Sequence, residues 1–135
     1  YARCRAAIAR AEARGSNRDI AGAVTDLERC MDIAEAASST LWTGVSATVM
    51  SDLLRGQEAA LGWAEQAVEA LEDAGEPIEL AYAWLALARA RWVTDPDGAT
   101  LAFERGRALV EQMDLEMPSP LCLEIEALKA RFNET

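Results

Sequence analysis

The chain has 135 residues, of which 51% are hydrophobic and 27% charged, and its formal net charge is −10. This is the composition of one globular domain, and it excludes a disordered chain. The negative charge argues against direct nucleic-acid binding, which needs clustered lysine and arginine, and no apolar run approaches the roughly 18 residues of a membrane span. The sequence has no histidine, which excludes Ser-His-Asp and Cys-His nucleophilic sites within it.

The first two predicted elements are helices. Residues 2–14 are expected to form one helix, with Gly15 as its C-terminal cap. Asp19, or one of the polar residues just before it, caps the next helix, which is expected over 19–37 because apolar residues recur there at helical spacing. Together they form a predicted hairpin over residues 2–37.

Two more helices are expected over 41–55 and 58–74, and they form a second hairpin over 41–74. The break before them contains serine and threonine, which cap helices well. Gly56 ends the first of the two helices and Gly75 ends the second, since glycine readily takes the left-handed conformation found after helices.

The next helix, expected over 77–93, is apolar on nearly every side, which predicts a central position in the fold. Its start at a proline suits the first turn of a helix. A turn with Asp97 as the cap precedes a helix over 98–114, and this pair forms a third hairpin over 77–114. A last helix over 120–132, capped by Ser119, is expected to cover the open end.

An internal repeat joins these elements. Three stretches align: Ala23-x3-Leu27-x2-Cys30, Ala60-x3-Ala64-x2-Ala67 and Ala99-x3-Phe103-x2-Gly106. Their spacings of 37 and 39 residues are typical of stacked helical hairpins. We therefore expect an all-α fold, a right-handed array of antiparallel helical hairpins with about seven helices, as a single domain over 1–135. The start at Tyr1 suggests a fragment of a larger protein.

The third hairpin resembles a tetratricopeptide repeat. The matching positions are Trp84-x2-Leu87-Ala88, for the W-x2-L-G of the motif, and Ala99-x3-Phe103, for its A-x3-F. Arg91 replaces the expected tyrosine, and the repeat is longer than the usual 34 residues. The motif residues match over about one repeat. The helical pattern resembles such repeats over most of the chain.

The second hairpin is also similar to the long-period repeats of bacterial regulators. The similar stretch is Ala60-Leu61-x2-Ala64-x2-Ala67-x3-Leu71-x3-Gly75. It resembles the helical arrays of the MalT-like LuxR-type regulators and of the actinobacterial antibiotic regulatory proteins. This resemblance implies that the repeats sense an inducer or a partner, while other domains bind ATP and DNA.

The tetratricopeptide resemblance implies a concave groove lined by the first helix of each hairpin. Taking Val49 and Ala88 as close-packing positions makes Val45 and Trp84 point into the hairpins. The groove residues are then Thr43, Ser46, Met50, Tyr82, Leu85, Arg89 and Trp92. Aromatic and arginine side chains are common anchors of interfaces. The alternative is that these side chains pack against neighbouring helices.

Other candidate sites favour structural interpretations. Glu65, Glu69, Glu72 and Glu76 form an acidic stripe at helical spacing. It could meet a cation or a basic partner, but carboxylates in one stripe repel each other and are typical of a solvated face. The Asp95–Gly98 turn lacks the rest of a calcium loop. We expect no metal, no cofactor and no enzymatic activity, and we expect reduced cysteines because their spacing fits no zinc site.

These patterns favour a cytoplasmic protein–protein interaction or regulatory sensor module, part of a bacterial multidomain protein that is a transcriptional regulator. Its concave groove would bind a protein or peptide segment, or a small inducer. The alternative is a homo-oligomerisation or scaffold element, for instance one that forms a homodimer. An all-α enzyme is a third class, disfavoured because the sequence has no paired inward carboxylate motif.

Overall fold

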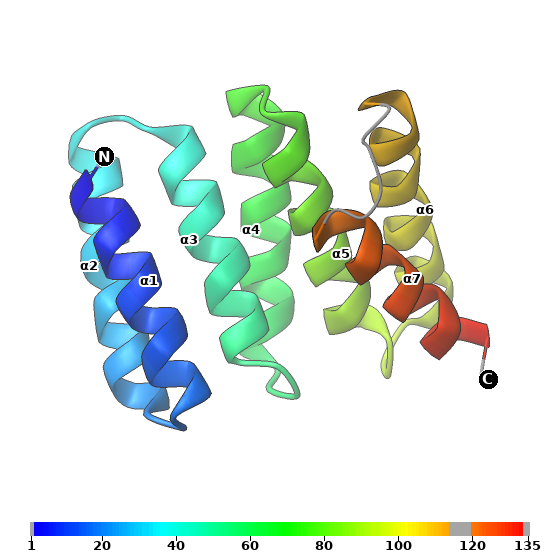
Figure 1. Cartoon of the computed structure of the whole chain (residues 1–135), viewed down its shortest axis with the longest axis horizontal. Coiled ribbons are helices and arrows are strands. Elements are labelled where there is room, and N and C mark those ends of the chain that lie inside the picture. Colours follow the sequence, from blue (N-terminus) through cyan, green and yellow to red (C-terminus); the bar gives the residue numbers. More distant parts are fainter. Residues whose placement is uncertain (1, 114–119, 134–135) are drawn as a thin grey trace.

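The computed structural model describes residues 2–113 and 120–133, and the side chains of 6–113 and 120–131. Within these residues the chain is all-α and contains no strand, as predicted. Figure 1 shows the helices, which are α1 (Ala2–Ser16), α2 (Ile20–Ala36), α3 (Thr40–Leu53), α4 (Ala59–Ala74), α5 (Pro77–Arg91), α6 (Pro96–Met113) and α7 (Pro120–Asn133).

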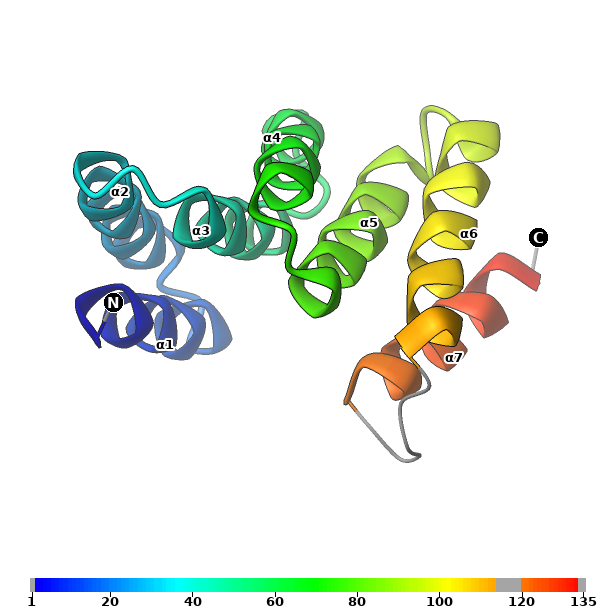
Figure 2. The same cartoon turned by 90° about the horizontal axis from the view of Figure 1, so that it is seen from above.

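Successive helices alternate in direction from α1 to α6 and pack as neighbours (Figure 1). The most extensive contacts are within the pairs α1–α2, α3–α4 and α5–α6, which are joined by contacts of α2 with α3 and of α4 with α5. Helix α3 also contacts both α1 and α5, whereas α2, α4 and α6 hardly touch one another in the described part of the chain. The array therefore curves, with α1, α3 and α5 on its inner side (Figure 2). Its handedness stays a prediction.

The internal repeat marks the buried faces of α2, α4 and α6. All nine of its positions are buried: Ala23, Leu27 and Cys30 on α2, Ala60, Ala64 and Ala67 on α4, and Ala99, Phe103 and Gly106 on α6. Small residues at these positions let helices approach closely. The repeat in the sequence is thus a repeat of packing contacts, although the residues themselves vary in size.

Helix α3 buries small and hydroxyl residues against its neighbours. A Cβ atom on Gly44 would lie 2.4 Å from Cγ of Leu71, so α3 and α4 are in direct contact there. The Ser46 hydroxyl donates to Sγ of Cys30 at 3.0 Å, and the Ser51 hydroxyl donates to the carbonyl of Ala60 at 2.9 Å. These bonds satisfy buried hydroxyls that would otherwise destabilise the core.

Several helix ends follow the sequence predictions. The Asp19 carboxylate accepts the Gly22 amide at 3.1 Å and caps α2, as expected. Gly75 ends α4 at φ 71°, in the left-handed region, and Pro77 opens α5. Each of these residues satisfies a requirement of the adjacent backbone, so the sequence alone was enough to predict its role.

The predicted end of α1 at Gly15 is wrong. The helix continues through Gly15 to Ser16, and Arg18 takes the positive φ of 65° instead. A Cβ atom at position 15 would lie 2.8 Å from Cδ1 of Leu53 at the end of α3. This glycine is therefore needed for a close approach between two helices, which a local reading could not show.

The predicted cap of α6 is also wrong. The helix begins at Pro96, and the carboxylate of Asp95, not Asp97, accepts the Gly98 amide at 3.1 Å. Proline suits the first position of a helix because it has no amide hydrogen to leave unpaired there, so the helix starts two residues earlier than expected. Ser119, the predicted cap of α7, lies outside the described residues.

A buried carboxylate joins α1 to α2. Asp26 is only 3% exposed, and Arg14 Nη1 lies 3.1 Å from its Oδ2 while Arg10 Nε lies 3.6 Å from its Oδ1. A carboxylate can be buried only when paired. Arg10 and Arg14 of α1 therefore neutralise a charge inside the first hairpin.

Trp84 was predicted to point into its hairpin, and it packs against α6 of that hairpin at the edge of the core. Its ring is half-buried, and the guanidinium carbon of Arg105 on α6 lies 5.3 Å from the ring centre. This distance permits a cation–π contact. Trp84 therefore packs between α5 and α6 with one side toward solvent.

The last helix closes the array. Leu121, Ile125 and Leu128 on α7 are buried, and α7 contacts α6. Glu124, on the same helix, forms an ion pair with Arg89 of α5. Helix α7 thus lies against the third hairpin through an apolar stripe and one ionic contact.

Candidate functional site

The inner side of the array contains a groove with two pockets that meet at Asp52. The first, here the inner pocket, has a volume of about 480 Å³ and is bordered by α1, α3, α5 and α7. It is lined by Glu12, Val45, Thr48, Val49, Asp52, Glu79, Tyr82 and Glu124. The apolar side chains come from neighbouring turns of α3, while every one of the four helices supplies a carboxylate. The inner pocket is therefore acidic around an apolar patch.

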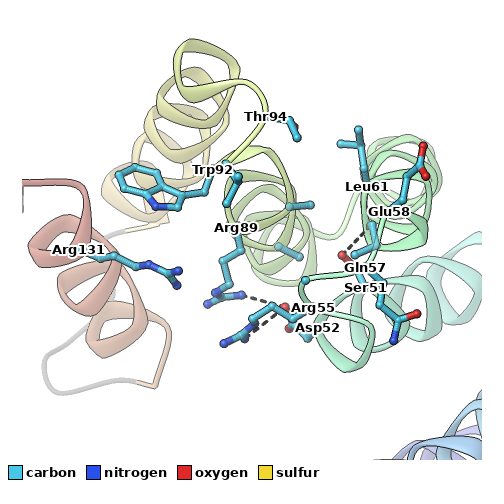
Figure 3. Close-up of a pocket in the computed structure, with 15 residues that line it drawn as sticks. Ser51, Asp52, Arg55, Gln57, Glu58, Leu61, Arg89, Trp92, Thr94 and Arg131 are labelled. Atoms are coloured by element: carbon cyan, nitrogen blue, oxygen red, sulfur yellow. Dashed lines mark hydrogen bonds and ion pairs between the residues drawn. The ribbon is translucent and has the colours of Figure 1, made fainter. Parts of the chain in front are cut away.

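The second, here the edge pocket, lies where α5 ends, between the α3–α4 turn and α7. Its volume is about 440 Å³. Its lining includes Asp52, Arg55, Leu61, Arg89, Trp92 and Arg131, which Figure 3 shows as sticks. Asp52 lines both pockets, so they are neighbours along the groove.

An ion-pair cluster separates the two pockets. Arg89 is 9% exposed in its side chain, and its Nη1 donates to Oδ1 of Asp52 at 3.1 Å, while its other terminal nitrogen pairs with Glu124. Arg55 Nη2 lies 3.9 Å from the same Asp52 oxygen. One guanidinium from α5 thus connects α3 to α7, and so connects the second and third hairpins to the closing helix.

Burial sets the ionisation of this cluster. It raises the pKa of Asp52, although Arg89 and Arg55 lower it in part. Burial also lowers the pKa of Arg89, and the nearby positive charges of Arg55 and Arg131 act in the same direction. Both partners of the central ion pair therefore lie in a site that penalises charge, and each favours the charged form of the other.

Tyr82 gives the inner pocket a hydrogen-bonding group. Burial raises the pKa of its phenol, and the neighbouring Glu79 and Cys122 raise it further. The phenol therefore remains a neutral donor at any ordinary pH. A half-buried tyrosine beside two valines and several carboxylates can hold an apolar side chain and donate to a polar one.

The structure separates the predicted groove residues into three groups. Tyr82 lines the inner pocket, and Arg89 and Trp92 line the edge pocket, so these three do lie on the groove. Ser46, Met50 and Leu85 are at most 1% exposed and belong to the core. Thr43 is half-buried, lines neither pocket, and donates its hydroxyl to the Ser39 carbonyl at 2.9 Å.

The groove residues on α3 were predicted wrongly because the predicted orientation of the helix about its axis was off by about one residue position. Val49 was taken as the close-packing residue, whereas Gly44 makes the close contact, with Leu71. Val45 and Val49 consequently face the inner pocket, and Ser46 and Met50 turn into the core. A change of one residue rotates a helix position by roughly 100°.

Sequence reasoning also missed Asp52, Glu79 and Glu124 in the inner pocket, and Arg55 and Arg131 in the edge pocket. One signal for Asp52 was present. Val49 lies four residues after Val45, and Asp52 lies three residues after Val49, which puts all three on one helix face. Nothing local identified Glu124 or Arg131, because their place depends on where α7 packs.

The predicted acidic stripe on α4 lies apart from the groove. Glu65, Glu69 and Glu72 are exposed and border a shallow depression beside Trp84 and Arg105 on the outer side of the array. No group of three or more acidic or cysteine side chains in the described part of the chain could hold a metal ion. No helix among those residues is both long and apolar enough to cross a membrane.

Comparison with known proteins adds no relative. No protein-family model, curated protein or solved structure matches the chain. The groove must therefore be interpreted from its own geometry and charge.

Proposed function

We propose that the chain is a binding module whose groove holds an extended or helical segment of a partner protein. The observation that supports this most is the inner pocket, where four helices from separate parts of the sequence surround an apolar patch with carboxylates. Curved helical arrays present such inner surfaces to partners. The partner contacts would be made by Tyr82, Val45 and Val49.

The charge of the groove defines the partner segment. The inner pocket is lined by four carboxylates and by no basic side chain, in a chain of net charge −10. Asp52 and Glu124 pair with Arg89, and Glu12 and Glu79 supply the remaining negative charge. Complementary charge speeds association and selects partners. The segment would therefore have lysine or arginine side chains beside one or two apolar ones that fill the space near Val45 and Tyr82.

The resemblance of the second hairpin to the repeats of bacterial regulators supports a role for this module within a larger protein. We propose that it is the sensor part of a multidomain transcriptional regulator in the cytoplasm. Binding in the groove would change how α3, α5 and α7 pack, and this change would reach the attached domains. The Arg89 ion pairs support this role because one side chain joins all three of these helices.

A selection from a displayed library of random peptides tests the proposal. The purified chain should select peptides that contain basic and apolar residues. In fluorescence anisotropy, the exchange Glu79→Lys should weaken their binding about tenfold or more, and Tyr82→Ala should do the same. Glu69→Lys is the matched control, since it makes the same charge change on the outer face, and it should have a small effect.

Two results would contradict the proposal. One is equal weakening by Glu79→Lys and Glu69→Lys, which would show attraction by net charge alone. The other is concentration-dependent dimerisation in sedimentation that Glu79→Lys abolishes, because the groove would then serve a second copy of the chain. Thermal unfolding of each variant shows whether the fold is kept.

A further inference from the structure

The lining of the edge pocket contains more basic than acidic side chains, although the chain as a whole is acidic. Three guanidinium groups, from Arg55, Arg89 and Arg131, point toward one another in it (Figure 3). The carboxylates in its lining are Asp52 and Glu58. A cluster of positive charge inside a chain of net charge −10 needs a specific explanation.

The existing ion pairs leave part of this positive charge unmatched. Arg89 is fully engaged, since Asp52 and Glu124 take its two terminal nitrogens. Arg55 has only a 3.9 Å contact with the Asp52 oxygen that Arg89 already holds. Arg131 forms no ion pair with any of the described side chains, although it acts on the pKa of Arg89 as a nearby like charge.

The rest of the pocket is apolar and concave. Leu61 from α4, Ala86 and Ala90 from α5, and Trp92 and Val93 after it form its wall. Val93 is 84% exposed, which is unusual for a valine. A volume of about 440 Å³ suits a small organic molecule, and an apolar wall with a few convergent polar groups is the usual form of a ligand site.

We propose that the edge pocket binds a small organic anion, with its oxyanion group between Arg55 and Arg131 and its apolar body against Trp92. The guanidinium fork suits carboxylate and phosphate groups alike. This proposal adds a class of ligand to the proposed sensor function. It rests on that function only because it assumes that the groove is a ligand-binding surface. The enclosed shape and the flanking carboxylates of Asp52 and Glu58 disfavour a nucleic-acid backbone.

Binding would fix the last helix. Arg131 lies on α7, while Arg55 lies in the turn after α3, so an anion held by both would bridge the closing helix and the second hairpin. Only Arg89, among the ion pairs that the structure describes, now makes that connection. The ligand would also offset the repulsion among the three guanidinium groups.

Two fluorescent probes test the proposal with the intact chain. The first is 8-anilinonaphthalene-1-sulfonate, an aromatic molecule with one permanent oxyanion. The second is N-phenyl-1-naphthylamine, which has the same rings without the sulfonate. The anionic probe should bind about tenfold more tightly or better, because charged hydrogen bonds add to the shared apolar contact. Equal affinity would overturn the proposal.

Matched variants locate the binding site. Arg131→Gln should weaken the anionic probe about tenfold and leave the neutral one nearly unchanged. Lys129→Gln removes the same charge two positions away on the same helix, outside the edge pocket, and should have little effect. In NMR spectra, the Trp92 indole signal should shift on binding. Equal effects of the two variants, or an unmoved Trp92 signal, would overturn the proposal.

Competition experiments distinguish a small organic anion from a peptide as the ligand of the edge pocket. They also test the edge-pocket proposal separately from the inner-pocket proposal. Octanoate, a simple organic acid, should displace the probe, and octanamide should not. Displacement by the selected peptides but not by octanoate would contradict a small-molecule site. Probe binding that persists in Glu79→Lys and Tyr82→Ala would support the edge pocket even if peptide binding failed, so the two proposals can fail separately.

Discussion

Arg89 forms the ion pairs that join the helices around the groove. It is nearly buried, and it pairs with one carboxylate from α3 and one from α7. Removing one member of such a cluster leaves the others in a site that penalises charge, and this costs more than the ion pair itself contributes. The ionisation of Asp52 should therefore respond directly to changes at position 89.

The exchange Arg89→Gln should raise the pKa of Asp52 further. Burial already raises this pKa, and Arg89 is the strongest opposing influence. Between the ordinary pKa of an aspartate and the raised one, the native state binds more protons than the unfolded state, so the free energy of unfolding falls as pH rises through that window. In the Arg89→Gln variant, this pH range should extend to higher pH.

Carbon-13 NMR titration of the Asp52 carboxyl group measures this shift, and urea unfolding at several pH values measures its effect on stability. A lower pKa of Asp52 in the Arg89→Gln variant would contradict the account. Arg107→Gln is a suitable control, because the ion pairs of Arg107 within the described part of the chain are with exposed glutamates on its own helix.

Asp26 makes a second prediction at the scale of single residues. It is 3% exposed, and Arg14 is its nearer partner. Arg14→Gln should lower the free energy of unfolding by about 1–3 kcal/mol, because a buried acceptor loses a charged partner. Arg29→Gln, at an exposed position on α2, should change it by about 0.5 kcal/mol or less. Urea unfolding measures both, and equal effects would show that the burial of Asp26 has no such cost.

Single residues also show what the sequence could predict. Asp19, Gly75 and Pro77 were assigned correctly because capping depends only on neighbouring backbone. Gly15 was assigned wrongly because its role is a contact with Leu53, which is far away in sequence. The ion pairs of Arg89 could not be predicted for the same reason.

At the scale of helices, α3 was the element hardest to place. Its buried face consists of Gly44, Ser46, Ala47, Thr48, Met50 and Ser51, so hydrophobicity does not distinguish its inside from its outside. The helices α2 and α4 have clear apolar faces, and their buried positions followed the repeat. Half of the inner-pocket lining was missed because it lies on α3, the one helix whose rotation the sequence left undetermined.

The close contact at Gly44 gives a prediction for the second hairpin. Gly44→Ala should lower the free energy of unfolding by about 1–3 kcal/mol, because the new methyl group would overlap the Leu71 side chain. Gly62→Ala, on the exposed side of α4, has open space around it and should raise this free energy by about 0.5–1 kcal/mol. Chemical unfolding compares the two, and equal effects would contradict the close packing of α3 on α4.

At the scale of the whole molecule, the sequence predicted the helical class, the number of helices in the described residues and most of their ends. These follow from periodicity and turn residues, which are local. The curvature of the array and the place of α7 depend on how helices distant in sequence pack together. The inner pocket draws on four such helices, and its lining therefore became visible only in the structure.

The position of α7 gives a prediction for the array as a whole. In Arg89→Gln, amide hydrogen exchange should become about tenfold faster in α7, because its ionic link to α5 is lost, while α2 should be unaffected. The ends of helical arrays open separately from the rest. Equal acceleration in α2 and α7 would show that Arg89 stabilises the whole fold and not the attachment of α7.

The most direct test of the central claim is to find where a selected peptide binds. Methyl NMR spectra of the chain, titrated with the tightest peptide, would report on Val45 and Val49 in the inner pocket and on Val68 beside the outer face. A peptide in the inner pocket should cause large shifts for Val45 and Val49 and little change for Val68. Shifts confined to Val68 and the surroundings of Trp84 would contradict it, because the partner would then bind the outer side of the array.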